Sequence, residues 1–521
     1  MTAIDHLAIL PIVLPLAAGA VMLMVDEGRQ TLKAAISVAT SLALLAIAVT
    51  LVVLANHTPV TVYRVGDWPA PFGIVLVVDR LSAAMMLLTS TLALASLVFS
   101  LARWHRAGPR FHSLAMFLVM GVNGAFLTGD LFNLFVFFEV LLAASYGLAL
   151  HGSGEPRVHA SLHYIVVNLA ASLLFLVGAS LIYGATGTLN MADLAVHWQE
   201  AAPGDRVLFE VGGAILGVAF LVKAGMWPLC FWLPGAYSAA VAPAGALFAV
   251  LTKVGVYVIL RTGVLFLGVD VAASPSPGTP WLVVAGAATL AFGSLGVLAS
   301  QNLARLASYC VLVSSGTLLA TIAIDDVALT AGALYYLVVS TLALAAFFLL
   351  VELMERGRQP GADVLAVTAE AFLSDDDDDE GNEAFGNLIP APTALLGITF
   401  AACAVMIAGL PPLAGFVGKF AMLSALLGPA HVSATSWIVF GLLIASGFFT
   451  TIAMVRAGIG RFWASEMVAR VRVVEIAPII GLLVACAVLT ATSGPALRYF
   501  GEAAASLHYP TPYVDRVMSP R

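Results

Sequence analysis

The sequence predicts an all-α membrane protein that crosses the bilayer many times. Of its 521 residues, 61% are hydrophobic and 10% are charged, and the mean hydropathy is +1.00. Soluble domains carry about 25% charged residues. Because a hydrocarbon core about 30 Å thick needs about 20 apolar residues per helix, the apolar segments that recur along the chain are expected to be membrane spans. We expect residues 1–521 to form a single integral membrane domain.

About fourteen such segments can be separated on this length criterion. They are predicted at residues 7–25, 32–55, 79–101, 113–129, 131–151, 161–183, 207–240, 243–263, 281–299, 303–324, 330–354, 393–428, 434–457 and 473–493. The seventh and twelfth contain proline and glycine and are expected to be discontinuous helices. The first has no basic region before it, so we expect a retained span rather than a signal peptide.

Basic residues gather in alternate loops between these segments. The odd-numbered loops contain Arg29, Lys33, Arg103, Arg106, Arg110, Arg157, Arg305, Arg356, Arg358, Arg456, Arg461, Arg470 and Arg472. The even-numbered loops contain little beyond Arg64, Arg80, Arg206 and Arg261. Since short cytoplasmic loops carry the excess of lysine and arginine, the odd loops are expected to be cytoplasmic and both termini to lie outside.

The formal net charge of -7 has a local origin. The predicted cytoplasmic loop at residues 360–390 contains the run DDDDDE at Asp375 to Glu380. Such a run is typical of a solvated loop without fixed structure. The alternative is that it concentrates cations at a cytoplasmic entrance.

Lysine is used in an unusual way. Of the four lysines, three lie within apolar segments, namely Lys223, Lys253 and Lys419. A lysine at the centre of a bilayer costs at least about 2.5 kcal/mol. Arginine stays charged, whereas a buried lysine can release its proton, so these lysines are candidate proton carriers. Snorkelling to the interface is the alternative, but it does not suit Lys253, which lies ten residues, about 15 Å of helix, after Pro243.

Prolines accompany these lysines. Pro228 follows Lys223 by five residues, Pro243 precedes Lys253 by ten, and Pro411 and Pro412 precede Lys419. Proline frees backbone groups that are tolerated at membrane depth only where protein or a watery cavity satisfies them. The two interrupted segments are five spans apart, which is the pattern of inverted repeats. We therefore predict repeats at residues 113–263 and 281–457.

One carboxylate completes the candidate site. Glu139 lies nine residues, about 13.5 Å along a helix, after Asp130 at the edge of its span. An unpaired carboxylate at this depth takes up a proton or seeks a cation, and Lys223 is the expected partner. The alternative is a purely structural salt bridge.

Motifs for other chemistry are missing from the sequence. The GKF around Lys419 lacks the GxxxxGK spacing and the Ser or Thr of a phosphate loop. The four cysteines are isolated and form no CxxC pair. We therefore expect no cofactor, no bound metal and no nucleic-acid partner.

The motifs around these residues resemble a known family. LLAASY after Glu139, the stretch KAGMWPLCFWLPGAYSAAVAPAGALFAVLTKVGVYVILR and the segment GLPPLAGFVGKF resemble the antiporter-like subunits shared by Mrp-type cation/proton antiporters and respiratory complex I. Within this family the motifs look closest to those of the D subunits of the Mrp antiporters, and the resemblance covers essentially the whole chain. It implies fourteen helices, two inverted repeats, discontinuous seventh and twelfth helices, and a central hydrophilic axis.

The resemblance also implies roles for individual residues. Glu139 and Lys223 would be the coupled pair, Lys253 the next proton carrier and Lys419 the terminal one. Basic residues that many relatives carry near Ala304 or Ser340 are missing here. Between Lys253 and Lys419 the axis is then expected to use water and hydroxyl groups. The candidates are Tyr335, Tyr336, Ser340 and Thr341.

Two histidines complete the predicted site. His159 and His163, at the cytoplasmic entry to the sixth span, are predicted to gather protons; the alternative is an ordinary interfacial position.

The predicted function is that of a secondary transporter subunit and not an enzyme. The resemblance implies a multi-pass subunit of a bacterial cytoplasmic membrane that works with other membrane subunits and exchanges protons for Na+ or another monovalent cation. The alternative is a proton-pumping subunit of a complex I-like enzyme or a membrane-bound hydrogenase. An independent solute permease is a third, less favoured possibility.

Overall fold

The computed structural model describes residues 5–200, 202–267, 279–356, 390–428, 432–462 and 471–519. The helices are α1 (Leu10–Met24), α2 (Gln30–His57), α3 (Arg80–Ser100), α4 (Phe111–Leu127), α5 (Leu131–Ala149), α6 (Glu155–Thr186), α7 (Met191–Glu200), α8 (Pro203–Ala224), α9 (Trp232–Ala239), α10 (Ala242–Leu267), α11 (Thr279–Ala299), α12 (Leu303–Ile322), α13 (Val327–Arg356), α15 (Ala391–Ala408), α16 (Ala414–Leu426), α17 (Ala434–Phe462), α18 (Val473–Ala491), α19 (Ser493–His508) and α20 (Thr511–Met518). The predicted acidic loop at 360–390, with its run at Asp375 to Glu380, lies outside the described residues apart from its last position.

Most of these helices are long and apolar. Twelve of the described helices are long and apolar enough to cross a membrane, and α1, α4 and α16 are shorter apolar helices. The polytopic helical architecture predicted from the sequence is therefore confirmed. The count differs from fourteen because α1 and α4 have only 15 and 17 residues, which span less than a full hydrocarbon core at 1.5 Å per residue.

A small sheet departs from the predicted all-α fold. Strands β1 (Val60–Arg64) and β2 (Val75–Asp79) form an antiparallel hairpin in the register Val60↔Asp79. The second strand, VLVVD, immediately precedes the third span. Its valines favour a strand because β-branched side chains pack well on a pleated surface.

Both predicted helix breaks are present. Helix α8 is capped at its C-terminus by Gly225, which has φ +74°, and α15 is capped by Gly409, which has φ +76°. Each break follows one pattern, AGMWPL at residues 224–229 and AGLPPL at residues 408–413. Glycine is suited to these ends because it adopts positive φ without strain. Pro243 makes no break, since it is the second residue of α10, where its missing N–H costs nothing.

The odd-numbered loops meet at one end of the bundle. Arg157 Nε, after the fifth span, donates to the carbonyl of Ala239 at 2.7 Å. Arg472 Nη1, before α18, donates to the carbonyl of Ala102 after α3 at 3.2 Å. Arg356 at the end of α13 pairs with Glu475 of α18. We call this end of the bundle the odd-loop end.

The even-numbered loops meet the terminal segments at the other end. Arg64 of β1 donates to the carbonyl of Ser519 at 2.6 Å, and Arg80 pairs with Glu502 of α19. His508 lies 2.9 Å from a carboxylate oxygen of Asp325 between α12 and α13. The alternation of loops predicted from the sequence is thus present in the structure.

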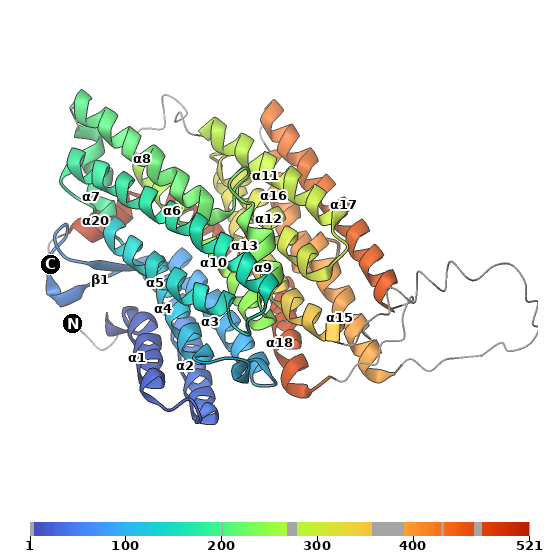
Figure 1. Cartoon of the computed structure of the whole chain (residues 1–521). Coiled ribbons are helices and arrows are strands. Elements are labelled where there is room, and N and C mark those ends of the chain that lie inside the picture. The colour runs from blue at the N-terminus through green and yellow to red at the C-terminus, as the bar shows by residue number, and fades with distance from the viewer. Residues whose placement is uncertain are drawn as a thin grey trace, which may run out of the picture.

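The centre of the bundle is formed by α10, α12 and α13. Most residues of these helices are buried, whereas only about a third of the residues in the apolar windows of α2, α15, α17 and α18 are. In Figure 1 the chain runs from α1 and α2 at one side, through α10, α12 and α13 in the middle, to α17 at the other. Polar groups on the three central helices are therefore shielded from lipid.

Candidate ion-translocation site

Lys253 occupies the centre of the molecule. Its side chain is fully buried on α10, and Nζ lies 3.5 Å from Ser315 Oγ of α12. Neighbouring Thr252 is also fully buried, and its hydroxyl has no partner within the described parts of the chain. Snorkelling does not account for Lys253, because the residues on either side of it are buried as well.

Lys223 lies at the broken end of α8, two residues before Gly225. It is buried, and Nζ lies 3.5 Å from Ser172 Oγ of α6. The ammonium group is also 5.1 Å from the ring centroid of Phe138 on α5, within the range of a cation–π interaction. The surroundings of Lys223 therefore supply weak, neutral contacts.

Glu139 directly follows Phe138 on α5, the residue whose ring contacts the Lys223 ammonium group. Within the described residues the two side chains form no direct ion pair, since Lys223 contacts Ser172 and Phe138 instead. Oxygen Oε1 of Glu139 is buried and has no hydrogen-bond partner there. A buried carboxylate oxygen left in this way requires water or a proton.

Lys419 is buried on α16 and contacts the other broken helix. Its Nζ donates to the carbonyl of Ala408, the last residue of α15, at 2.9 Å. A Cβ at Gly409 would lie 2.6 Å from Lys419 Cδ, so the glycine leaves room for the lysine stem. The lysine thus satisfies one of the carbonyls that the helix break leaves free.

Hydroxyl groups occupy the space between Lys253 and Lys419. Ser314 is next to Ser315 on α12, and its Oγ lies 3.0 Å from Oγ of Ser340 on α13. Tyr336, one turn before Ser340, is buried and packs closely against Gly418 of α16. A Cβ atom added to Gly418 would lie only 3.1 Å from Cα of Tyr336. Two of the predicted bridging residues, Tyr336 and Ser340, therefore lie between the lysines.

The other two predicted hydroxyl groups, those of Tyr335 and Thr341, form hydrogen bonds away from the lysines. Tyr335 donates to the carbonyl of Leu489 on α18, and Thr341 donates to the carbonyl of Leu337 in its own helix. Ser172, Ser314 and Ser315 were not predicted from the sequence. Serine in an apolar helix gives no distinctive signal because its hydroxyl usually bonds to the helix backbone.

His159 and His163 are not brought together with the lysines. Both are exposed on α6, on the same face as Leu162 and Val166. Ser172, which contacts Lys223, lies on the buried face of α6. The two histidines therefore lie on the outer surface of the bundle, away from Lys223.

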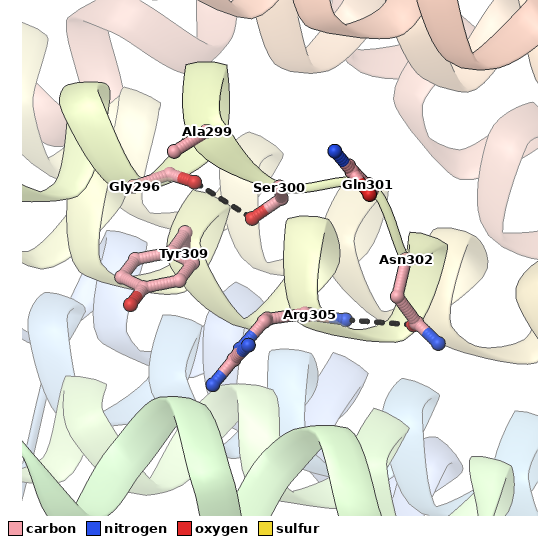
Figure 2. A pocket seen from close by; sticks show the side chains of 7 residues that line it. All are labelled: Gly296, Ala299, Ser300, Gln301, Asn302, Arg305 and Tyr309. Atoms are coloured by element: carbon pink, nitrogen blue, oxygen red, sulfur yellow. Dashed lines mark hydrogen bonds between the residues drawn. The ribbon is translucent and has the colours of Figure 1, made fainter.

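A surface pocket lies away from these residues, at the odd-loop end. Figure 2 shows its lining by Gly296, Ala299, Ser300, Gln301, Asn302, Arg305 and Tyr309. Asn302 Oδ1 accepts from the backbone N–H groups of Ala304 and Arg305 and caps α12. The pocket does not include any of the four buried candidate residues.

The part of the chain that the structure describes holds no group of three or more His, Cys, Asp or Glu residues that could bind a metal ion. The four cysteines are free and buried.

The fold and the buried lysines define a class of membrane proteins. The chain belongs to the family described as "NADH:quinone oxidoreductase/Mrp antiporter, TM", which matches residues 128–452. This confirms the resemblance predicted from the sequence. The chain is an antiporter-type transport subunit and not an enzyme.

Individual relatives match over nearly the full length. The chain is 57% identical to the D subunit of a probable K(+)/H(+) antiporter of Rhizobium meliloti (strain 1021), over 99% of this chain and 98% of that one. It is 35% identical to the D subunit of the Na(+)/H(+) antiporter of Alkalihalophilus pseudofirmus, over 99% of both. The solved structure of the Mrp complex from Dietzia sp. DQ12-45-1b contains a chain that matches with a TM-score of 0.84 and 28% identity, over 100% of both chains.

Proposed function

We propose that this chain is the D subunit of a multisubunit cation/proton antiporter and that it moves protons along Glu139, Lys223, Lys253 and Lys419. The observation that carries the proposal is the contact set of the three lysines. Each is buried, and the hydrogen-bond acceptor of each is a neutral oxygen, from Ser172, Ser315 or the Ala408 carbonyl. A buried ammonium without a paired carboxylate is costly, and a lysine can avoid that cost by releasing its proton.

The helices that carry these residues support a continuous path. Along the series α5, α6, α8, α10, α12, α13 and α16 each helix packs against the next. Four residues with hydroxyl groups lie between Lys253 and Lys419, namely Ser315, Ser314, Ser340 and Tyr336. Lysine-to-serine distances of 3.5 Å are long for hydrogen bonds, so ordered water completes the path in this proposal.

The proposed topology has fourteen spans. Helices α1 and α4 cross as short spans, α8 with α9 forms the seventh, and α15 with α16 forms the twelfth. Residues 113–263 and 281–457 are the two inverted repeats, and the shared break patterns AGMWPL and AGLPPL support their relation. The arginine-rich odd-loop end is cytoplasmic, and both termini lie outside a bacterial cytoplasmic membrane.

This orientation predicts a labelling pattern. A cysteine replacing exposed Asp26 in the first loop should be shielded from a membrane-impermeant maleimide in intact cells, whereas one replacing exposed Ala202 should react. The four native cysteines are buried, so background labelling should be low. Reaction at Asp26→Cys with protection at Ala202→Cys would invert the orientation.

The exchanged cation is proposed to be K+, with Na+ as the alternative. The relative that is 57% identical is named for K+ and the one that is 35% identical for Na+. The assembled complex in proteoliposomes should dissipate an imposed pH gradient when K+ is added. Na+ should act more weakly, and this chain alone should be inactive because its relatives are subunits.

The same preparation tests the proposed function. Co-purification with several small membrane subunits and a cation-dependent pH response support antiport. Co-purification with cluster-binding redox subunits, together with no pH response to any monovalent cation, would contradict antiport. It would instead support a proton-pumping subunit of a redox enzyme.

A further inference from the structure

Each broken helix packs against a glycine of the span that follows it. Helix α15 ends at Ala408, which contacts Gly447 of α17, and helix α8 ends at Ala224, which contacts Gly255 of α10. In both places the contacted residue is the alanine that opens the break patterns AGLPPL and AGMWPL. The same contact therefore recurs at the corresponding place in the two halves of the chain.

The contact at Gly447 includes the side chain of Lys419. A Cβ atom added to Gly447 would lie 3.1 Å from the carbonyl oxygen of Ala408 and 3.5 Å from Lys419 Nζ. These two atoms are the acceptor and the donor of the hydrogen bond that Lys419 makes at 2.9 Å. The bare backbone of α17 at Gly447 thus forms one wall of the Lys419 site.

The ammonium group of Lys419 needs the space beside this wall. An ammonium group has three donor hydrogens. Lys419 is 6% exposed, and among the described residues its Nζ has one acceptor, the Ala408 carbonyl. The remaining donors require water at this depth. A side chain at position 447 would occupy space next to both the ammonium group and its acceptor.

Glycines also bound the Lys419 site at the break itself. A Cβ at Gly409 would lie 2.6 Å from Lys419 Cδ and 3.3 Å from Nζ. A Cβ at Gly415, near the start of α16, would collide with the carbonyl oxygen of Met406 on α15. Close approach of backbone to the lysine is therefore a general feature of this site, and Gly447 supplies it from α17.

The equivalent contact at Gly255 is closer still. A Cβ there would lie 2.6 Å from the backbone nitrogen of Ala224 and 2.9 Å from the carbonyl carbon of Lys223. Both are backbone atoms, which cannot rotate aside as a side chain can. Because Gly255 lies two residues after Lys253, it joins the helix that carries Lys253 to the break that carries Lys223.

Ordinary helix packing is the alternative explanation for a glycine in a membrane span. Other glycines of α17 separate the two explanations. A Cβ at Gly458, eleven residues or about 16.5 Å from Gly447, would lie 3.1 Å from the ring of Phe400 on α15. A Cβ at Gly441 would meet nothing within 4 Å. Gly458 therefore packs on the same helix as Gly447 but at a distance from Lys419.

We propose that Gly447 is a positioning residue of the ion path, which keeps Lys419 Nζ at the Ala408 carbonyl and leaves room for water beside it. The inference rests on the proposed function, because it concerns the geometry of the last carrier in that path. The corresponding contact of Gly255 with the end of α8 supports it, since both breaks are then seated in the same way.

The test uses the assembled complex in inverted membrane vesicles. Gly447→Ala should assemble and lower cation-driven proton movement by at least about tenfold, because a displacement of about 1 Å at a reacting group is costly. It should also move the alkaline limit of transport to lower pH, since an ammonium group with a weaker acceptor and less water releases its proton more readily. Gly458→Ala and Gly441→Ala, the matched controls, should keep the wild-type pH profile.

A wild-type rate and pH profile in assembled Gly447→Ala would overturn the inference. A lower rate with an unchanged pH profile would also overturn it, because helix packing alone predicts that result. If Gly447→Ala fails to assemble on a native gel, the double variant with Lys419→Gln decides, since glutamine is one bond shorter than lysine. Recovered assembly supports a conflict with the ammonium group, and continued failure overturns the inference. Wild-type complex without cation-driven proton movement would instead overturn the proposed function.

Discussion

Glu139→Gln should assemble normally and lower cation-driven proton movement by at least about 10²-fold, as expected when a proton-transfer group is lost. The reason is that Glu139 has a buried oxygen without a partner in the described residues and directly follows Phe138, whose ring contacts the Lys223 ammonium group. Glutamine keeps the shape of the side chain but cannot bind a proton or attract the ammonium. The measurement is fluorescence dequenching of a pH probe in inverted vesicles, normalised to assembled complex.

Two further variants complete this test. Lys223→Ala should show the same loss, because the pair acts as a unit. Glu210→Gln, which removes an exposed carboxylate from α8, is the matched control and should transport normally. A purely structural pair would instead lose expression or assembly in Glu139→Gln and Lys223→Ala. Normal transport by assembled Glu139→Gln would remove the carboxylate from the path.

Lys419→Gln should assemble and yet lose cation-driven proton movement. A glutamine amide can still donate to the Ala408 carbonyl, which Lys419 Nζ contacts at 2.9 Å, so the helix break remains satisfied. The amide cannot take up a proton near neutral pH. Lys419→Arg should also be impaired, because guanidinium holds its proton too tightly to transfer it.

The structural alternative gives the opposite result. If Lys419 only satisfies the end of α15, Lys419→Gln should transport at the wild-type rate. Lys419→Met should then be the damaging change, because an unpaired buried carbonyl costs about 1–3 kcal/mol. Assembly measured by native gel, together with transport in vesicles, separates these outcomes. Full transport by Lys419→Gln would leave Lys253 as the last carrier.

The positions of the helix breaks and of the buried lysines could be predicted because their signals are local. Glycine and proline at residues 225–228 and 409–412 interrupt any helix wherever it packs. A lysine within an apolar segment is unusual in itself. The alternation of arginine between loops likewise predicted which loops share an end, and contacts such as Arg472 with Ala102 confirm that grouping.

Other parts of the site could not be predicted because they depend on partners distant in the sequence. Ser315 becomes relevant only through Lys253, which precedes it by 62 residues, and Ser172 only through Lys223, which follows it by 51. The hairpin at 60–79 depends on pairing between β1 and β2. His159 and Ser172 are polar residues of the same helix, and helix packing exposes the first and buries the second.

The sequence by itself determined the membrane class, the broken helices and three lysines at membrane depth, because hydropathy, backbone restriction and the cost of a buried charge act residue by residue. The tertiary structure decided which polar groups meet. It placed Lys253 against Ser315, Lys419 against the end of α15, and Lys223 against Ser172 and Phe138, with no direct ion pair to Glu139 in the described residues. Contacts between side chains on different helices depend on how those helices pack and rotate, which periodicity and composition do not specify.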